Sequence, residues 1–178
     1  MVITIKNLIL WRHAEAELAD IALSVEDDMA RELTPKGQRQ AKLMARWLQE
    51  QLPKNLILLS SPAVRAFQTA ETLKHNINVH AALKPGATPQ EILTALANIE
   101  SPQNVLIVGH QPWLGALVAY LTGSAEMNIK KSAIWWLRLS LINQTLINQS
   151  SINPSSVNST LAQASYSILT VQTPSLMR

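Results

Sequence analysis

The stretch Leu8-Ile9-Leu10-Trp11-Arg12-His13 decides the fold expected for this chain. Four consecutive apolar residues indicate a buried strand, and this strand ends at a guanidinium and an imidazole, which do not belong in an apolar core. In a parallel α/β sheet, ligands bind in the crevice beyond the carboxyl ends of the strands. We therefore expect Arg12 and His13 to lie at a ligand site. An Arg-His pair on its own is more often a surface feature. Two later segments are therefore needed to support a ligand site at Arg12 and His13.

Those two segments are apolar runs that end in the same way. Residues 55–59 (Asn-Leu-Ile-Leu-Leu) lead to Arg65, and residues 104–108 (Asn-Val-Leu-Ile-Val) lead to His110. Both runs fit short, buried parallel strands. The spacing predicts a helix that begins at Pro62 with Ser61 as its cap, so Arg65 would lie in the first turn. A cation in the first turn of a helix is unfavourable, because the helix dipole is positive there. Either a bound anion compensates for the charge of Arg65, or Arg65 is simply exposed to solvent.

The remaining segments supply helices and two further strands. Thr34-Pro35 and Thr88-Pro89 predict helix starts, and Gly123 predicts a helix end. Residues 132–141 and 166–171 are expected to be closing strands. Strands that alternate with helices in this order predict an α/β fold. We expect a three-layer α/β/α sandwich, with a mostly parallel central sheet and antiparallel closing strands at its edge.

The 178 residues predict a single domain over positions 1–178 with two unusual segments. Residues 14–33 hold seven of the twelve acidic residues and have a net charge of −6, which leaves +9 for the rest of the chain. We expect an acidic, lid-like loop there, with one helical turn. Residues 143–160 carry no charge and are rich in Asn, Ser and Gln, which predicts a flexible hairpin connection.

Composition excludes several classes of function. The chain has no Cys, no apolar run that could span a bilayer and no leader pattern, so we expect a cytoplasmic protein without membrane contact. No basic cluster has interleaved aromatic residues, so no nucleic-acid partner is expected. The four histidines lack metal-ligand spacing, so we expect neither a metal nor a cofactor. The basic remainder can attract phosphorylated or acidic partners, or it is simply a solvated surface.

The three strand ends together predict phosphoryl transfer. If the strands are parallel, Arg12, His13, Arg65 and His110 converge on one crevice and form a site for a compact dianion. Arg12, Arg65 and His110 would bind the phosphoryl oxygens, and a neutral ring nitrogen of His13 would attack the phosphorus. Water would then hydrolyse the phosphohistidine intermediate. Because the arginines hold the charge, this chemistry does not require a metal.

Four motifs carry a resemblance to a known family. They are Arg12-His13, residues 33–41 (Leu-Thr-Pro-Lys-Gly-Gln-Arg-Gln-Ala), residues 61–71 (Ser-Pro-Ala-Val-Arg-Ala-Phe-Gln-Thr-Ala-Glu) and residues 108–110 (Val-Gly-His). In order and spacing they resemble the histidine phosphatase (phosphoglycerate mutase-like) superfamily over about residues 5–141. The resemblance implies that His13 is the phosphorylated nucleophile and that Arg12, Arg65 and His110 form the phosphate pocket.

The length of the chain indicates which subgroup of that superfamily it resembles. The short chain and the Ser132-Ala133-Ile134 strand entry look most like the SixA-type phosphohistidine phosphatases of bacteria. Ala14 departs from the pattern, because the superfamily usually has Gly after the His. Large members carry an inserted cap with a carboxylate that protonates an alcohol leaving group, and this chain shows no such insert.

Without an inserted carboxylate, the predicted substrate is one whose leaving group needs no dedicated acid. An alkoxide needs an acid, whereas the conjugate acid of a histidine leaving group has a pKa of about 6.5 and leaves readily. We predict a metal-independent phosphatase that acts on phosphohistidine in a phosphorylated signalling protein of the histidine phosphotransfer type. One alternative is a phosphomonoesterase for a small phosphorylated substrate, and another is a non-catalytic phosphate-binding module. The first alternative needs an acid, for which the candidates are Glu15, Glu17, Asp20 and Asp28.

Overall fold

Six strands form one mixed sheet in the order β3-β2-β4-β1-β5-β6. The computed structural model describes residues 5–18, 24–99, 103–142 and 163–177. The strands are β1 (Asn7–Arg12), β2 (Leu56–Ser60), β3 (Ile77–Val79), β4 (Asn104–Gly109), β5 (Ile134–Ile142) and β6 (Gln163–Gln172). Strands β1 to β4 run parallel, β5 is antiparallel to β1, and β6 is antiparallel to β5. The predicted sheet, with antiparallel closing strands at one edge, is confirmed.

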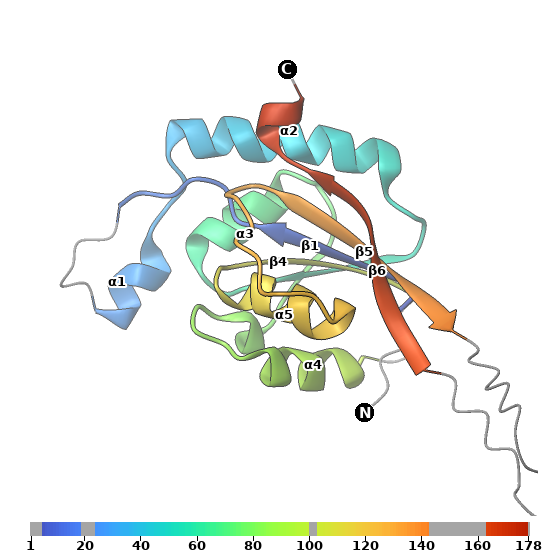
Figure 1. Ribbon diagram of the computed structural model, residues 1–178. Helices are drawn as coiled ribbons and strands as arrows, with labels where there is room; N and C mark the ends of the chain where they lie inside the picture. The colour runs from blue at the N-terminus through green and yellow to red at the C-terminus, as the bar shows by residue number, and fades with distance from the viewer. Residues whose placement is uncertain (1–4, 19–23, 100–102, 143–162, 178) are drawn as a thin grey trace, which may run out of the picture.

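Helices cover both faces of this sheet (Figure 1). The covering helices are α2 (Pro35–Gln51), α3 (Val64–Glu71), α4 (Pro89–Ala97) and α5 (Trp113–Thr122). The short helix α1 (Val25–Ala30) contacts α3 and has no buried residue, and the 3-10 turns are η1 (Ala81–Leu83) and η2 (Pro174–Leu176). Within the described ranges, no helix is long and apolar enough to cross a membrane.

Two hydrophobic cores, one on each face, explain the three layers. Alternate residues of a strand point to opposite faces. Leu8 and Leu10 therefore pack in the core beneath α4 and α5, while Ile9 and Trp11 pack beneath α2 and α3. All four side chains are fully buried. The continuous apolar run of β1 is thus the consequence of a strand that is covered on both sides, as predicted.

Local capping sets the helix ends that the sequence predicted. The Thr34 hydroxyl accepts a hydrogen bond from the Gly37 amide at the start of α2. Thr88 and Glu91 form a capping box at the start of α4. Gly123 ends α5 with φ of 69°, a left-handed conformation that a glycine adopts without strain.

The start of α3 differs from the prediction. The helix begins at Val64 with Ala63 at the N-cap position, not at Pro62 with Ser61 as the cap. The Ser61 hydroxyl instead accepts a hydrogen bond from the Ala63 amide at 3.2 Å and contacts His110. Arg65 nevertheless lies in the first turn of the helix, as expected.

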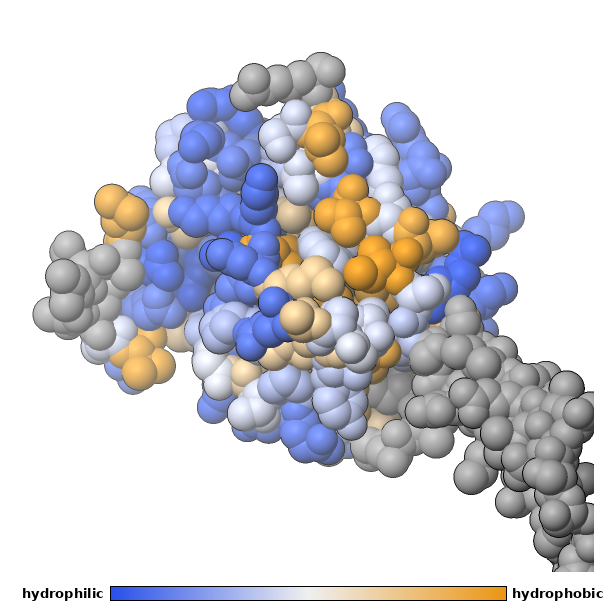
Figure 2. All heavy atoms as spheres, in the orientation of Figure 1, coloured by the Kyte–Doolittle hydropathy of each residue, from blue (hydrophilic) through white to orange (hydrophobic). Residues whose placement is uncertain are grey.

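In its described part, residues 14–18 and 24–33, the acidic segment contains more secondary structure than the expected single helical turn. Within residues 14–33, α1 forms six residues of helix behind a Ser24–Asp27 capping box, and Ala16 forms an isolated antiparallel bridge with Leu33. The predicted hairpin connection at 143–160 lies outside the described residues. Figure 2 shows hydrophilic side chains over α2, whereas apolar side chains gather along β6, where Ile168 and Leu169 are exposed.

Candidate active site

The parallel register brings the predicted site residues to one edge of the sheet. Arg12, the last residue of β1, pairs with Gly109, the last residue of β4. The His13 amide donates to the Gly109 carbonyl at 2.9 Å, so the chain segments carrying His13 and His110 leave the sheet side by side. Their imidazole centroids lie 5.0 Å apart with the rings tilted by 52°. Arg65 approaches from the first turn of α3, and it is buried together with both histidines.

A single hydrogen bond orients the His13 ring. Its Nδ1 lies 2.7 Å from the carbonyl oxygen of Ala14. Because a carbonyl oxygen only accepts, Nδ1 carries the proton and Nε2 keeps its lone pair. Burial, assisted by the charges of Arg65 and Arg12 and opposed by the Ala14 hydrogen bond, lowers the pKa of His13 to about 3. At neutral pH His13 is therefore a neutral imidazole whose Nε2 is unprotonated.

His110 is held by Ser61 and packed against Trp113. Its Nε2 lies 2.7 Å from the Ser61 hydroxyl, while its buried Nδ1 has no hydrogen-bond partner among the described residues. Burial, together with smaller contributions from His13 and Arg65, lowers the pKa of His110 to about 2. The Trp113 ring stands edge-on at 6.4 Å between centroids. A side chain at Gly109 would overlap that ring, since an added Cβ would lie 2.1 Å from it.

Both arginines have a hydrogen-bond donor without an acceptor, which indicates an anion site. Arg12 donates from Nη1 to the Ile129 carbonyl at 2.6 Å. Arg65 donates from Nη1 to the backbone carbonyl of Asp28 and from Nη2 to its carboxylate at 3.0 Å. Within the described ranges, the Nε atoms of both arginines are buried without an acceptor. Burial lowers the pKa of Arg12 and Arg65, but a guanidinium stays charged in proteins. An anion would satisfy these donors.

Thr69 links the two halves of the site and was missed from the sequence. Its hydroxyl accepts from the Ala14 amide at 3.1 Å and donates to the Arg65 carbonyl at 2.7 Å. Thr69 lies four residues after Arg65 on the same face of α3, and it is fully buried. The four-residue spacing could have placed Thr69 on the same helix face as Arg65. Its contact with Ala14 could not be predicted, because the two residues are 55 positions apart in the chain.

The candidate acids divide into three groups. Glu15 pairs with Lys36 at 2.9 Å, and that hydrogen bond lowers the pKa of its carboxyl. Asp28 pairs with Arg31 at 2.7 Å and with Arg65; burial raises its pKa, but the two arginines outweigh that effect and the net pKa is lowered. Glu17 is exposed, and Asp20 lies outside the described residues. At neutral pH Glu15 and Asp28 are therefore carboxylates.

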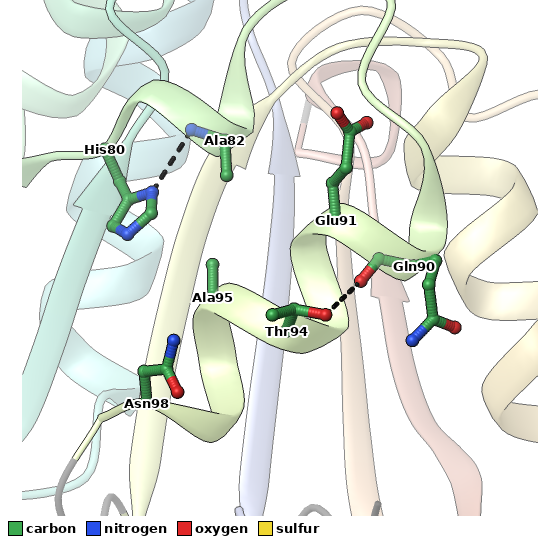
Figure 3. A pocket seen from close by; sticks show the side chains of 7 residues that line it. All are labelled: His80, Ala82, Gln90, Glu91, Thr94, Ala95 and Asn98. Atoms are coloured by element: carbon green, nitrogen blue, oxygen red, sulfur yellow. Dashed lines mark hydrogen bonds between the residues drawn. The ribbon is translucent and has the colours of Figure 1, made fainter.

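A separate hollow of about 370 Å³ lies between η1 and α4 (Figure 3). Its polar groups serve local structure, because His80 Nδ1 accepts from the Ala82 amide at 3.2 Å and Glu91 belongs to the capping box with Thr88. None of the four strand-end residues lines this hollow. Across the part of the chain that the structure describes, no group of three His, Asp or Glu side chains could hold a metal ion.

Comparison with known proteins identifies relatives of this chain. The family profile described as histidine phosphatase superfamily (branch 1) matches residues 8–88. The chain is 35% identical over 124 residues to phosphohistidine phosphatase SixA of Escherichia coli (strain K12), covering 65% of this chain and 73% of that protein. It is 31% identical over 132 residues to the phosphohistidine phosphatase SixA homolog of Haemophilus influenzae, covering 66% and 77% of the two chains.

Comparison with solved structures also finds a SixA structure with a similar fold. The structure of the protein histidine phosphatase SixA complexed with tungstate superimposes with a TM-score of 0.70 at 25% identity. That match covers 97% of this chain and 99% of the other. With the motifs, the strand-end geometry and these relatives in agreement, the chain belongs to the histidine phosphatase superfamily.

Proposed function

We propose that this protein hydrolyses phosphohistidine on a phosphorylated protein, with His13 as the nucleophile. One observation carries the proposal: the Ala14 carbonyl holds His13 Nδ1–H, so the lone pair of Nε2 is available beside Arg12, Arg65 and His110. The names of the Escherichia coli and Haemophilus influenzae relatives support the substrate class.

The proposed reaction has two steps. In the first, His13 Nε2 attacks phosphorus, and the P–N bond to the substrate histidine breaks with its electron pair going to the substrate ring nitrogen, which takes up a proton from solvent. In the second, water attacks the phosphorylated His13 and loses a proton to solvent, inorganic phosphate leaves, and the electron pair of the P–N bond returns to Nε2. Arg12, Arg65 and His110 stabilise the charge on the phosphoryl oxygens in both steps. Because the guanidinium groups supply the positive charge, we infer that no metal is required.

The ionised carboxylates favour an imidazole leaving group. Glu15 is engaged by Lys36 and Asp28 by Arg31 and Arg65, so neither is set up to donate a proton at neutral pH. An alkoxide would need such a donor, whereas imidazole accepts a proton near neutrality. We therefore favour a phosphohistidine of a cytoplasmic histidine phosphotransfer protein as the substrate.

Hydrolysis of a small phosphomonoester is the second candidate. Asp28 favours it, because its carboxylate touches Arg65 and would lie next to a phosphoryl group bound there. To act as a general acid, the Asp28 carboxylate would first have to be displaced from the Arg65 guanidinium by the substrate and then take up a proton. This candidate predicts that turnover of monoesters depends on the Asp28 carboxyl group.

A side-by-side turnover assay tests the proposal. The substrates are a phosphohistidine phosphotransfer domain and a panel of small phosphomonoesters, assayed with a chelator present. The enzymes are the wild type, His13→Ala and the matched control His75→Ala, whose imidazole is exposed. We expect the phosphohistidine to be hydrolysed faster than any monoester, with a loss of at least about 10³-fold in His13→Ala and no loss in His75→Ala.

The intermediate gives a second, independent measurement. Alkaline quenching during turnover of a radiolabelled phosphoprotein should leave acid-labile label on His13, identified by peptide mapping, and none in His13→Ala. Full activity of His13→Ala would refute the nucleophile. Faster hydrolysis of one monoester than of phosphohistidine would replace the proposed substrate with the second candidate.

A further inference from the structure

A basic trough leads away from the candidate active site. A hollow of about 360 Å³ is lined by three cations (Arg12, Lys130 and Lys131), by one carboxylate (Glu15), and by Gln40, Asn128 and residues 173–175. A neighbouring hollow of about 310 Å³ shares Gln40, Pro174 and Ser175, and adds Lys36 and Arg39. Because Gln40, Pro174 and Ser175 line both hollows, the two lie next to each other, between Arg12 and the start of α2. We call these two hollows together the basic trough.

Most of the positive charge in the basic trough is uncompensated. Lys130, Lys131 and Arg39 are exposed, and none of them forms an ion pair within the part of the chain that the structure describes. Lys36 is the exception, since Glu15 lies 2.9 Å from its ammonium group. A row of unpaired cations beside a phosphate site raises the local concentration of acidic ligands.

The lysines are held firmly against the nucleophile segment. Ile129, which precedes them, is fully buried and accepts the 2.6 Å hydrogen bond from Arg12. The Ser132 amide, which follows them, donates to the His13 carbonyl at 3.1 Å. The backbone on both sides of the Lys130–Lys131 pair is therefore tied to Arg12 and His13, so the two lysines lie next to the segment that carries His13.

The opposite rim carries the opposite charge. Helix α1 exposes Glu26 and Asp27 and touches the site through the Asp28–Arg65 pair. An acidic ligand is repelled there and attracted by Lys130 and Lys131. The two rims would thus orient a charged partner as well as attract it.

We infer that the basic trough docks acidic side chains that flank the phosphorylated histidine of a substrate protein. This inference rests on the proposed function and adds a specificity determinant to it. A chain segment fits better than a small dianion, because the trough extends over two hollows and combines cations with neutral polar side chains of Asn128, Gln40 and Ser175 that suit peptide groups. Lys130 and Lys131 are positioned to contact the substrate outside the phosphoryl pocket.

Two synthetic phosphohistidine peptides of equal length test the inference. One carries Asp and Glu on both sides of the phosphohistidine, and the other carries Asn and Gln at the same positions. The enzymes are the wild type, Lys130→Glu/Lys131→Glu, and the milder Lys130→Gln/Lys131→Gln in case charge reversal prevents folding. The matched control is Lys6→Glu/Lys54→Glu, which makes the same charge change at exposed positions before β1 and β2, at the other end of the sheet.

The expected result is a preference that depends on the two lysines. We expect the wild type to hydrolyse the acidic peptide with a kcat/KM about tenfold above that of the neutral peptide at low ionic strength. The preference should fall as salt screens the charges, disappear in Lys130→Glu/Lys131→Glu, weaken in Lys130→Gln/Lys131→Gln and survive in the control.

Two other results would overturn the inference in distinguishable ways. Equal rates for the two peptides, or a preference that survives in both lysine variants, would refute the docking role and leave phosphohistidine hydrolysis standing. If the wild type hydrolysed neither peptide but did hydrolyse a phosphomonoester, the proposed function would fail, and the docking inference with it.

Discussion

The carboxylate of Asp28 on α1 lies 3.0 Å from Nη2 of Arg65 on α3, and the backbone carbonyl of Asp28 accepts from Nη1 of the same guanidinium. Asp28 also binds Arg31 at 2.7 Å, so one carboxylate joins the acidic helix to the candidate phosphate pocket. A phosphoryl group that binds Arg65 meets a negative charge already in place. Asp28 therefore both orients Arg65 and competes with the anion that Arg65 would bind.

Removal of the Asp28 charge should tighten phosphate binding. Asp28→Asn keeps an oxygen acceptor for Arg65 and leaves the backbone contact intact, but it removes the repulsion between carboxylate and phosphate. We expect the inhibition constant of inorganic phosphate to fall about threefold to fivefold, which corresponds to at most about 1 kcal/mol for a partly exposed pair. Competitive inhibition measured at pH 7 checks this.

Glu26→Gln is the matched control for Asp28→Asn, because it removes one charge from the same helix at an exposed position. It should leave phosphate inhibition unchanged. If Asp28 were a general acid, Asp28→Asn would instead lose most turnover of phosphomonoesters without tighter inhibition by phosphate.

Loss of the Arg65 guanidinium should impair both binding and turnover. Arg65 is buried in the first turn of α3, and its Nε has no acceptor among the described residues. We expect Arg65→Ala to lower kcat/KM by about 10²- to 10³-fold, the range for removal of one preorganised donor. Arg65→Lys should recover little, because an ammonium cannot reproduce the planar fork. Arg46→Ala, an exposed arginine of α2, should have near wild-type kinetics, and comparable losses in both alanine variants would contradict a specific role.

The two buried histidines should make the protein sensitive to acid. The folded-state pKa values of His13 and His110 are about 3 and about 2, both below the ordinary value of 6.5. Below pH 6.5 the unfolded chain therefore takes up protons that the folded chain does not. The free energy of unfolding is highest above pH 6.5 and falls as the pH drops towards 3, by about 1.4 kcal/mol per pH unit for each histidine at most.

Denaturant unfolding at pH 7.0, 5.5 and 4.5 in phosphate-free buffer measures this acid sensitivity. His13→Asn and His110→Asn should each reduce the slope of the unfolding free energy against pH. His75→Asn should not, since its ring is exposed. Equal slopes in all four proteins would show that carboxylates alone cause the loss of stability.

Much of the site could be predicted because it follows from the topology. Apolar runs that end at Arg12-His13 and just before His110 indicate buried strands, and parallel strands bring their carboxyl ends to one edge. The start of α3 was predicted wrongly, because Ser61 is a good N-cap residue by type but its hydroxyl contacts His110 in the fold. A side chain's local preference is overridden when a tertiary partner is closer.

The contacts that orient the site could not be predicted. The Asp28–Arg65 pair spans 37 positions, the Ala14–Thr69 bond 55, and the Arg12–Ile129 bond 117. No periodicity or motif links such distant residues. The sequence predicted which side chains reach the crevice, while the partners that hold them depend on how helices and turns pack around it.

Gly37 offers the sharpest test of how α2 supports the segment that carries His13. A Cβ at this position would lie 1.8 Å from the backbone oxygen of Glu15, and the Thr34 amide donates to that same oxygen at 3.0 Å. Replacement of a helical glycine by alanine ordinarily stabilises a helix by about 1 kcal/mol. Here the neighbour is backbone and cannot rotate away, so we expect Gly37→Ala to lower the free energy of unfolding by about 1–3 kcal/mol.

The same substitution should lower activity, because Glu15 lies two residues from His13 and moves with it. Gly86→Ala is the control: an added Cβ there meets nothing within 4 Å, and its φ of 78° predicts only the left-handed strain of about 1–2 kcal/mol. Urea unfolding and phosphohistidine turnover of both variants separate the two effects, because Gly86→Ala should lose stability while keeping wild-type kcat. A Gly37→Ala variant that was more stable than the wild type, with unchanged kcat, would show that the Glu15 segment can yield and that close packing against α2 does not position His13.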